Sequence, residues 1–186
     1  MLINRDTIIN DSNPLIREKS LDVKVPLSLE DEKLLNEMLT YVIESTDETI
    51  AQEKNLEPAV GISAIQVGVK KKLCAIALRD ENGEISVQYA LANPKIVSYS
   101  IENSYLTSGE GCLSVPNRRE GLIKRHARIK VKAYDALKKE DVVIKQDGYL
   151  AIAFQHELDH FNGVLYYDHI NPDNPMDMDP NAIAID

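Results

Sequence analysis

Two histidines and a glutamate near the end of the chain have the spacing of a metal site. The stretch 155–160 reads Gln-His-Glu-Leu-Asp-His. His156 and His160 are four residues apart, so on a helix they lie on the same face, one turn from each other. Two imidazoles in this arrangement can bind one metal ion, and Glu157 beside them can act as a base. The alternative is a helix that carries two ordinary histidines.

The residues around this motif favour the metal site. Positions 149–161 are apolar around most of the circumference of a helix, which predicts a buried helix over this range. Its apolar residues are Leu150, Ala151, Ile152, Ala153, Phe154, Leu158 and Phe161. Buried histidine and glutamate side chains are costly unless they are paired or bound to a metal. Asn162 and Gly163 mark the end of the helix.

A catalytic metal of this kind takes three protein ligands and keeps one position for water, so a third ligand is required. No glutamate follows Glu157, so the peptidase class that uses a downstream glutamate does not fit. Tyr166 stands where the class with an extended motif has its third histidine, which excludes that class. The residues themselves leave four candidates: Cys112, His126, Asp168 and His169.

Cys112 is attractive as a ligand because a thiolate binds zinc or ferrous iron strongly. It lies in the stretch 110–116, Glu-Gly-Cys-Leu-Ser-Val-Pro. By its local sequence alone this cysteine fits a ligand, a nucleophile or a core residue equally well. A thiol bound to a metal is deprotonated and held in place, so Cys112 as a ligand would not also be a free nucleophile.

The periodicity of the rest of the chain predicts an α+β fold. Pro14 after Asn13 starts a short helix, and Ser28 caps a second helix that is expected to run to about Asn55. Strands are predicted at 73–78, 84–92, 95–99, 128–133 and 141–145, with Asn93-Pro94 between the second and third, a hairpin turn at Asn82-Gly83 and a loop at 58–68. We expect a mixed or antiparallel β-sheet packed around a central metal-binding α-helix, with N-terminal helices before it.

The chain length of 186 residues is that of one ordinary domain, and we expect a single domain over 1–186. Residues 171–186 are rich in Asp, Pro and Asn. We expect them to form a loosely ordered tail with local structure only at its very end.

The composition narrows the function classes. Forty-four per cent of the residues are hydrophobic, but no apolar run reaches the length of a membrane span. The first residues lack the features of a signal peptide, and two cysteines are too few for a disulfide framework. These features predict a cytoplasmic protein without membrane contact.

The formal charge of −9 argues against binding to nucleic acid through bulk charge, and no specific DNA binding is expected. Residues 118–132 nevertheless contain seven Lys or Arg residues. Three of them alternate with apolar residues, as on a half-exposed strand with a solvated basic face: Arg128, Lys130 and Lys132. Arg118 and Arg119 lie outside this alternation and could hold a substrate carbonyl or carboxylate.

Three stretches of the chain together resemble the peptide deformylase family. They are Val60-Gly61-Ile62-Ser63-Ala64-Ile65-Gln66, Glu110-Gly111-Cys112-Leu113-Ser114 and Gln155-His156-Glu157-Leu158-Asp159-His160. Their order and spacing are similar to the family pattern, and the segment between the first two resembles the longer class found in Gram-positive bacteria. The resemblance continues through 125–129 and 163–169 and covers most of the chain. Two positions of the substrate-side loop depart from the pattern: Ala59 replaces a usual glycine and Ile65 a usual proline.

The resemblance implies a metal-dependent hydrolase, a metallo-amidase that removes the formyl group from the N-terminal formylmethionine of newly synthesised proteins and releases formate. The implied metal ligands are Cys112, His156 and His160, with water in the fourth position. Glu157 is implied as general base and then general acid. Gln66 and the backbone N–H of Leu113 are implied as stabilisers of the oxyanion. The implied peptide contacts are Val60, Gly61 and Arg119, beside an apolar pocket for the methionine side chain.

The resemblance also implies the cofactor and the partners. Members of the family natively use one ferrous ion per chain, which zinc, nickel or cobalt can replace. Their substrates are N-formylmethionyl peptides, that is, nascent chains, and a transient contact with the ribosome would suit such an enzyme. General chemistry agrees, because hydrolysis of an amide needs an activated water, a base and donors to the oxyanion.

Two other functions compete with this one. A zinc peptidase whose third ligand is Asp168 or another downstream residue would share the histidine motif. A metal-binding relative without activity, which only binds peptides or the ribosome, would share the ligands. The intact pair of Glu157 and Gln66 argues against the second alternative.

Overall fold

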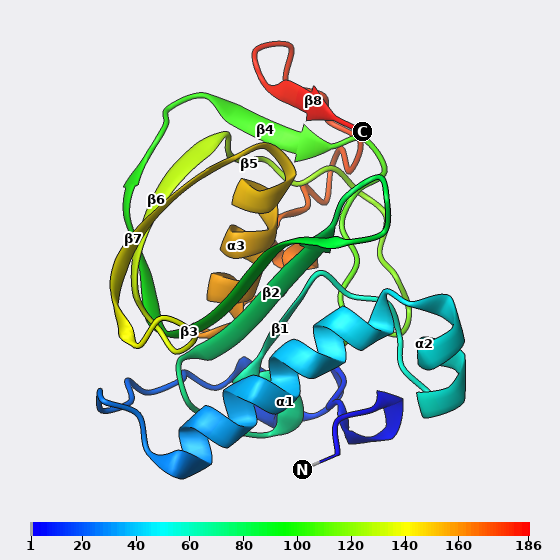
Figure 1. The fold of residues 1–186 in the computed structure, drawn as a ribbon. Helices are drawn as coiled ribbons and strands as arrows, with labels where there is room; N and C mark the ends of the chain where they lie inside the picture. Colours follow the sequence, from blue (N-terminus) through cyan, green and yellow to red (C-terminus); the bar gives the residue numbers. More distant parts are fainter. Residues whose placement is uncertain (1) are drawn as a thin grey trace.

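Two β-sheets and three α-helices form residues 2–186, the part of the chain that the computed structural model describes (Figure 1). The larger sheet is antiparallel, with the order β1 (Gly61–Ser63), β2 (Leu73–Arg79), β3 (Ile85–Tyr99), β6 (Arg128–Asp135) and β7 (Glu140–Asp147). The smaller sheet has the order β5 (Arg125–His126), β4 (Asn103–Leu106) and β8 (Ile183–Ile185), and β8 runs parallel to β4. The helices are α1 (Leu29–Ser45), α2 (Glu48–Lys54) and α3 (Gly148–His160), with short 3-10 helices at Arg5–Thr7, Pro14–Arg17, Ala64–Val67 and Tyr166–His169. The expected α+β fold is confirmed.

Strand β2 lies at the centre of the fold and is buried on both faces. Successive side chains of a strand point to opposite sides. Accordingly Leu73 and Ala75 pack in the core that contains α1, whereas Cys74 and Ile76 pack in the core that contains α3. The α3 core also contains Phe154 and Leu158 of the helix itself. The motif helix is therefore held against the sheet by apolar contacts, and Cys74 is a fully buried core residue.

The expectation of one helix from Ser28 to about Asn55 is wrong, because the chain breaks this helix in its middle. Helix α1 ends at Ser45, and α2 begins after Asp47. The Asp47 carboxylate accepts hydrogen bonds from the N–H groups of Thr49 and Ile50, both at 3.1 Å. A capping aspartate competes with the continuing helix for backbone donors, so it starts a new helix instead.

The two strands expected on either side of Asn93-Pro94 are one continuous strand, β3. The pairing of β3 with β6 shifts register between Ala92 and Lys95, so the proline lies at an irregularity where the ladder needs no N–H. Asn93 has a φ of 51°, and its side chain bonds to the N–H and C=O of Val23, both at 2.8 Å. These bonds hold the irregular backbone in place.

The region 58–68, expected to be a loop, contains strand β1 and the 3-10 helix Ala64–Val67. Strand β1 pairs with β2 and packs against α3. Strand β1 carries Gly61 and Ser63 to Glu157 of the motif helix, and the 3-10 helix after it carries Gln66 to Cys112. The strands predicted near 73–78, 128–133 and 141–145 are confirmed as β2, β6 and β7, and the helix predicted over 149–161 is α3.

The local structure expected at the end of the chain is strand β8. Upstream of it, the N–H of Leu122 donates to the C=O of Pro175 at 2.8 Å, and Lys124 pairs with Asp177 at 3.2 Å. Among residues 2–186, no helix combines the length and the apolar character needed to cross a membrane.

Candidate metal centre

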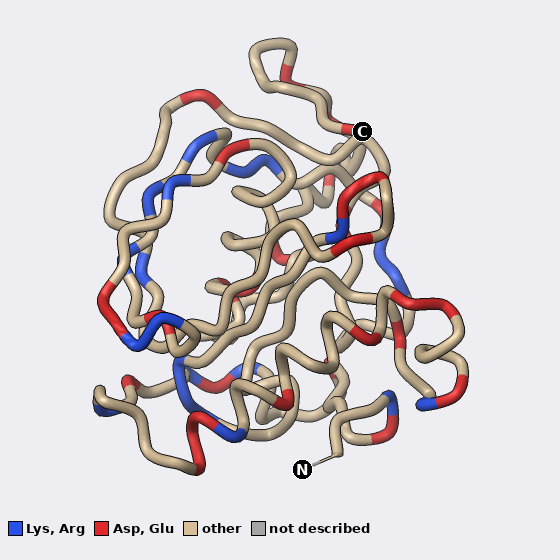
Figure 2. The backbone as a smooth tube through the Cα atoms, viewed as in Figure 1, with Lys and Arg blue, Asp and Glu red and all other residues tan. Residues whose placement is uncertain are grey.

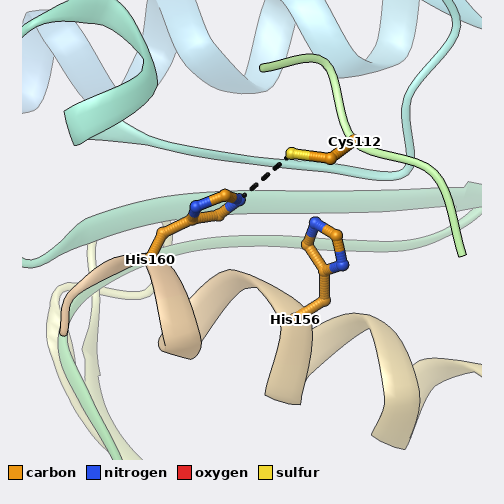
Figure 3. Close-up of side chains that lie close together, drawn as sticks. All are labelled: Cys112, His156 and His160. Carbon is orange, nitrogen blue, oxygen red and sulfur yellow. Dashed lines mark hydrogen bonds between the residues drawn. The ribbon is translucent and has the colours of Figure 1, made fainter. Parts of the chain in front are cut away.

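Three side chains converge on one point next to α3 (Figure 3). His156 and His160 project from successive turns of the helix, and Cys112 reaches them from the loop that follows β4. One ligand atom of each residue lies within 4.8 Å of the others, and Cys112 Sγ is 3.5 Å from His160 Nε2. Of the four candidates for a third ligand, Cys112 is the one that joins the two histidines.

The other three candidates are engaged elsewhere. His126 Nδ1 lies 2.9 Å from the C=O of Ser100. Asp168 forms an ion pair with Arg17, and His169 Nε2 lies 2.7 Å from the Asp159 carboxylate. These contacts disfavour the peptidase alternative that needs Asp168 as a ligand.

The electrostatics around the two histidines suit a bound cation. Burial lowers the pKa of His160, and the proximity of His156 lowers it further, so this imidazole is neutral, as a metal ligand must be. Burial also lowers the pKa of His156, but Cys112 and Glu110 outweigh burial and raise it. His156 lies between the Cys112 thiol and the Glu110 carboxylate, and this position favours a positive charge, which a metal ion would supply. The residues present fit a metal of the type that binds sulfur and nitrogen.

A buried network of charges orients the first histidine. Glu110 Oε2 lies 2.8 Å from His156 Nδ1, which leaves Nε2 of this ring for the metal. Arg125 donates to both oxygens of Glu110, at 2.8 and 2.9 Å, and to Asp159 at 2.5 Å. Sequence reasoning gave no role to Glu110, Arg125 or Asp159. The sequence offers one local sign of a role for Glu110, because this residue directly precedes Gly111 and the metal-ligand candidate Cys112.

The side chain of Glu157 projects from α3 and lies against two residues of β1, Gly61 and Ser63. Ser63 Oγ is 2.7 Å from Glu157 Oε2 and 2.9 Å from the backbone C=O of Glu157. A Cβ atom on Gly61 would lie 2.6 Å from Glu157 Oε1, so glycine is the residue that makes room for the carboxylate. Burial raises the pKa of Glu157, as expected for a group that must take up and release a proton. The contribution of Ser63 was not predicted.

Two hydrogen-bond donors lie beside Cys112. The N–H of Ser63 donates to Gln66 Oε1 at 2.9 Å, which fixes the orientation of the amide. Gln66 Nε2 then points to Ser114 Oγ at 3.2 Å and lies 3.6 Å from Cys112 Sγ. In the part of the chain that is described, no hydrogen bond engages the backbone N–H of Leu113. This arrangement leaves that N–H free to meet a developing negative charge.

A pocket of about 350 Å³ opens onto this centre. Its polar lining includes Gln66, Cys112, His156 and Glu157. Its other lining residues include Ala59, Val60, Gly61, Leu113, Tyr149, Ile152 and Ala153. Arg119 does not belong to the lining: its guanidinium carbon lies 3.8 Å from the centre of the Tyr167 ring. Ile65 is fully buried in the core and also lies outside the lining.

The geometry defines a class of site: three protein side chains that can hold one metal ion, with a buried carboxylate and an amide donor beside them. This is the arrangement of a hydrolytic metalloenzyme.

Comparison with known proteins identifies the family, because the family described as polypeptide deformylase matches residues 6–176. The chain belongs to this family. It is 43% identical over 185 residues to peptide deformylase 2 of Bacillus subtilis, with full coverage of both chains. It is 44% identical over 186 residues to the peptide deformylase of Macrococcus caseolyticus, again with full coverage of both.

Solved structures agree with the family. The chain is similar to the crystal structure of the peptide deformylase of Thermus thermophilus, with a TM-score of 0.72 and 26% identity over 91% of this chain and 87% of that one. It is similar to the peptide deformylase of Thermotoga maritima, with a TM-score of 0.68 and 30% identity over 89% of this chain and 97% of that one. The resemblance inferred from the three sequence stretches is confirmed.

Proposed function

We propose that this chain is the enzyme that removes the formyl group from the N-terminal formylmethionine of newly synthesised proteins. The observation that carries the proposal is the convergence of Cys112, His156 and His160 beside a pocket that is lined by Cys112, His156, Glu157 and Gln66. Residues 1–186 are proposed to act as a single catalytic domain, in agreement with a family match that spans residues 6–176.

The metal is proposed to be one ferrous ion per chain, held by Cys112, His156 and His160, with zinc, nickel or cobalt as substitutes. One thiolate and two imidazoles suit Fe²⁺ or Zn²⁺. When bound, such an ion lowers the pKa of a bound water and polarises a carbonyl group.

Glu157 is proposed to move the proton. Its carboxylate takes a proton from water as the water oxygen bonds to the formyl carbon. The same carboxyl then gives this proton to the methionine nitrogen as the bond between the formyl carbon and that nitrogen breaks. The products are formate and a free N-terminal amine. Gln66 Nε2 and the N–H of Leu113 are proposed to donate to the oxygen that becomes negative between these two events.

The peptide is proposed to lie along the pocket edge formed by Val60 and Gly61. The apolar lining residues Leu113, Tyr149, Ile152 and Ala153 are proposed to receive the methionine side chain. A contact from Arg119 to the peptide stays a prediction, since the guanidinium lies over Tyr167. Ala59 lines the pocket, so its departure from the usual glycine is expected to affect peptide affinity before it affects the metal.

The enzyme is proposed to work in the cytoplasm on nascent chains, in transient contact with the ribosome. Neither a membrane nor a specific DNA sequence is proposed as a partner. The net charge of −9 supports the absence of a DNA partner, because a negatively charged chain is repelled by the phosphates of DNA.

The test uses protein purified without oxygen. Bound metal and formate release from a formyl-methionyl tripeptide are measured on the same sample. We expect one bound iron or zinc ion per chain and rapid release of formate. Glu157→Ala should keep the metal and lose about 100- to 10,000-fold in turnover. Metal-loaded wild-type protein that releases no formate would overturn the proposed function.

A further inference from the structure

The larger sheet ends in an open edge at β7. Within residues 2–186, β6 is the one strand that pairs with β7, and β7 is the last strand of the sheet. It lies on the outer side of the sheet in Figure 1, and acidic and basic residues follow one another along it in Figure 2. An edge strand leaves a row of N–H and C=O groups that can pair with another strand. The eight residues of β7, Glu140–Asp147, form such an edge.

The side chains on the outer face of β7 alternate in kind. Ile144 is buried in the core that contains α3, so its neighbours Val143 and Lys145 point to the opposite face, together with Asp141. All three are exposed, and Val143 is 62% exposed although it is apolar. The outer face of the edge therefore carries a carboxylate, a valine and an ammonium group at equal spacing.

Neither charge on this face is neutralised by the part of the chain that is described. No ion pair there includes Asp141 or Lys145. The two residues are about 14 Å apart along the strand, which is too far for a bond within one chain. On β6, Lys145 stands opposite Lys130, and Asp141 stands opposite Tyr134. Because like charges opposite each other destabilise a sheet, Lys145 would gain from a carboxylate on its open side.

A second copy of β7 supplies this carboxylate in one register. A two-fold axis perpendicular to the sheet pairs residues that lie equally far on either side of one central residue, and it keeps every side chain on its own face. With Val143 at the centre, Asp141 of each copy lies opposite Lys145 of the other, and the two valines meet. On the other face of the sheet, Val142 lies opposite Ile144.

The two neighbouring registers lack this complementarity. Moving the centre one residue toward the C-terminus brings Asp141 opposite Asp147 of the other copy. Moving it one residue toward the N-terminus brings Lys145 opposite Lys139. Both changes place like charges opposite each other, which is unfavourable. The charges on the edge therefore select one register, and their symmetry about Val143 selects a second copy of this chain as the occupant.

We propose that two copies of this chain associate edge to edge through β7, with Val143 on the two-fold axis and Asp141 of each copy paired with Lys145 of the other. The larger sheet then continues from one copy into the next. A contact confined to the eight residues of β7 is small, so the association is weak and reversible. It uses no residue of the metal centre and does not depend on the proposed function.

Sedimentation velocity of the metal-loaded protein tests the association, at protein concentrations from about 1 to about 200 µM, the range of weak complexes. We expect the sedimentation coefficient of the wild type to rise with concentration from that of a monomer to that of a dimer. Lys145→Asp places two aspartates opposite each other at both symmetric positions, and Asp141→Lys places two lysines there. Each variant should associate at least about 10-fold more weakly than the wild type.

An equimolar mixture of the two variants gives the sharpest result. In a mixed dimer, the copy that carries Asp141→Lys presents two lysines and the copy that carries Lys145→Asp presents two aspartates. Both symmetric positions then regain opposite charges, so the mixture should recover the association of the wild type although neither variant associates well alone. An edge that binds an unrelated segment would not show this recovery.

Lys95→Asp is the matched control, because it makes the same change of charge at an exposed residue of β3, two strands away from the edge. It should associate like the wild type, and melting temperatures check that every variant is folded. Three results would each overturn the proposal: a wild type that stays monomeric throughout, a mixture that associates no better than the single variants, or a control that is weakened as much as Lys145→Asp.

Discussion

Arg125 should contribute more to the stability of this fold than any exposed arginine, and replacing it tests the network behind the metal centre. The side chains of Arg125 and Glu110 are each 4% exposed, and two hydrogen bonds join them. Arg125→Met keeps most of the length and the apolar stem but removes the positive charge. It leaves the Glu110 carboxylate buried with one partner fewer, and it leaves Asp159 without the guanidinium.

The loss of stability expected for Arg125→Met follows from the burial of the ion pair between Arg125 and Glu110. Removing one partner of a buried ion pair costs about 3–5 kcal/mol, because the other charge stays out of water. The pKa of Glu110 gives a similar figure. Burial raises this pKa, but the hydrogen bonds from Arg125 and His156 outweigh burial and lower it from 4.5 to about 2. A difference of that size corresponds to about 3 kcal/mol, which Arg125 and His156 supply together.

The same pKa sets the pH dependence. Because the folded-state pKa of Glu110 is lowered, its contribution to stability is fully present above pH 4.5 and is lost as the pH falls toward 2. The difference in unfolding free energy between wild type and Arg125→Met should therefore be largest near neutral pH and should shrink by pH 3.

Urea unfolding in the presence of a chelator measures this difference without a contribution from metal binding. Thermal unfolding should show a melting temperature lower by about 6–20 °C for a chain of this length. Arg128→Met is the control, since the Arg128–Glu102 pair is exposed and should be worth less than about 1 kcal/mol. If the two variants lost the same stability at pH 7, the buried network would not hold the fold as argued.

Three further changes test the individual parts of the site. Ser63→Ala removes a hydrogen-bond donor from the Glu157 carboxylate, and burial already raises the pKa of this group. The acidic limb of the pH profile of kcat/KM should therefore move to higher pH. An unchanged limb would refute this role of Ser63. Gly61→Ala places a methyl group 2.6 Å from Glu157 Oε1, so formate release should fall about 100-fold at unchanged metal content. Cys112→Ser should lower the metal content measured by atomic absorption; full retention would restore the peptidase alternative.

The chemistry of the site was readable from the sequence because its residue types are rare and its spacing is local. His156 and His160 lie on one face of any helix, so five residues of sequence were enough to predict the pair. Cys112 was one of four candidates for the third ligand until the resemblance to a family selected it. The structure agrees because only this candidate reaches the histidines.

The errors in the fold come from local interactions that override periodicity. The apolar spacing of 34–43 continues well enough into 50–51 to suggest one helix, but the cap at Asp47 divides it. Pro94 suggested the end of a strand, but the bonds from the Asn93 side chain to Val23 keep β3 continuous. In both cases a single side chain that bonds to the backbone decides the outcome, and periodicity does not record such bonds.

The partners of the buried charges were beyond sequence reasoning for a related reason. Glu120 is only five residues from Arg125 and would be the natural partner by sequence distance, whereas Glu110 is fifteen residues away. Yet Glu120 is exposed and Glu110 is buried beside the guanidinium. A buried guanidinium must be paired, whereas an exposed carboxylate gains little from pairing, so desolvation selects the distant partner. That choice also brings the second oxygen of Glu110 to His156 and orients a metal ligand, so the interaction that stabilises the core is the one that prepares the site.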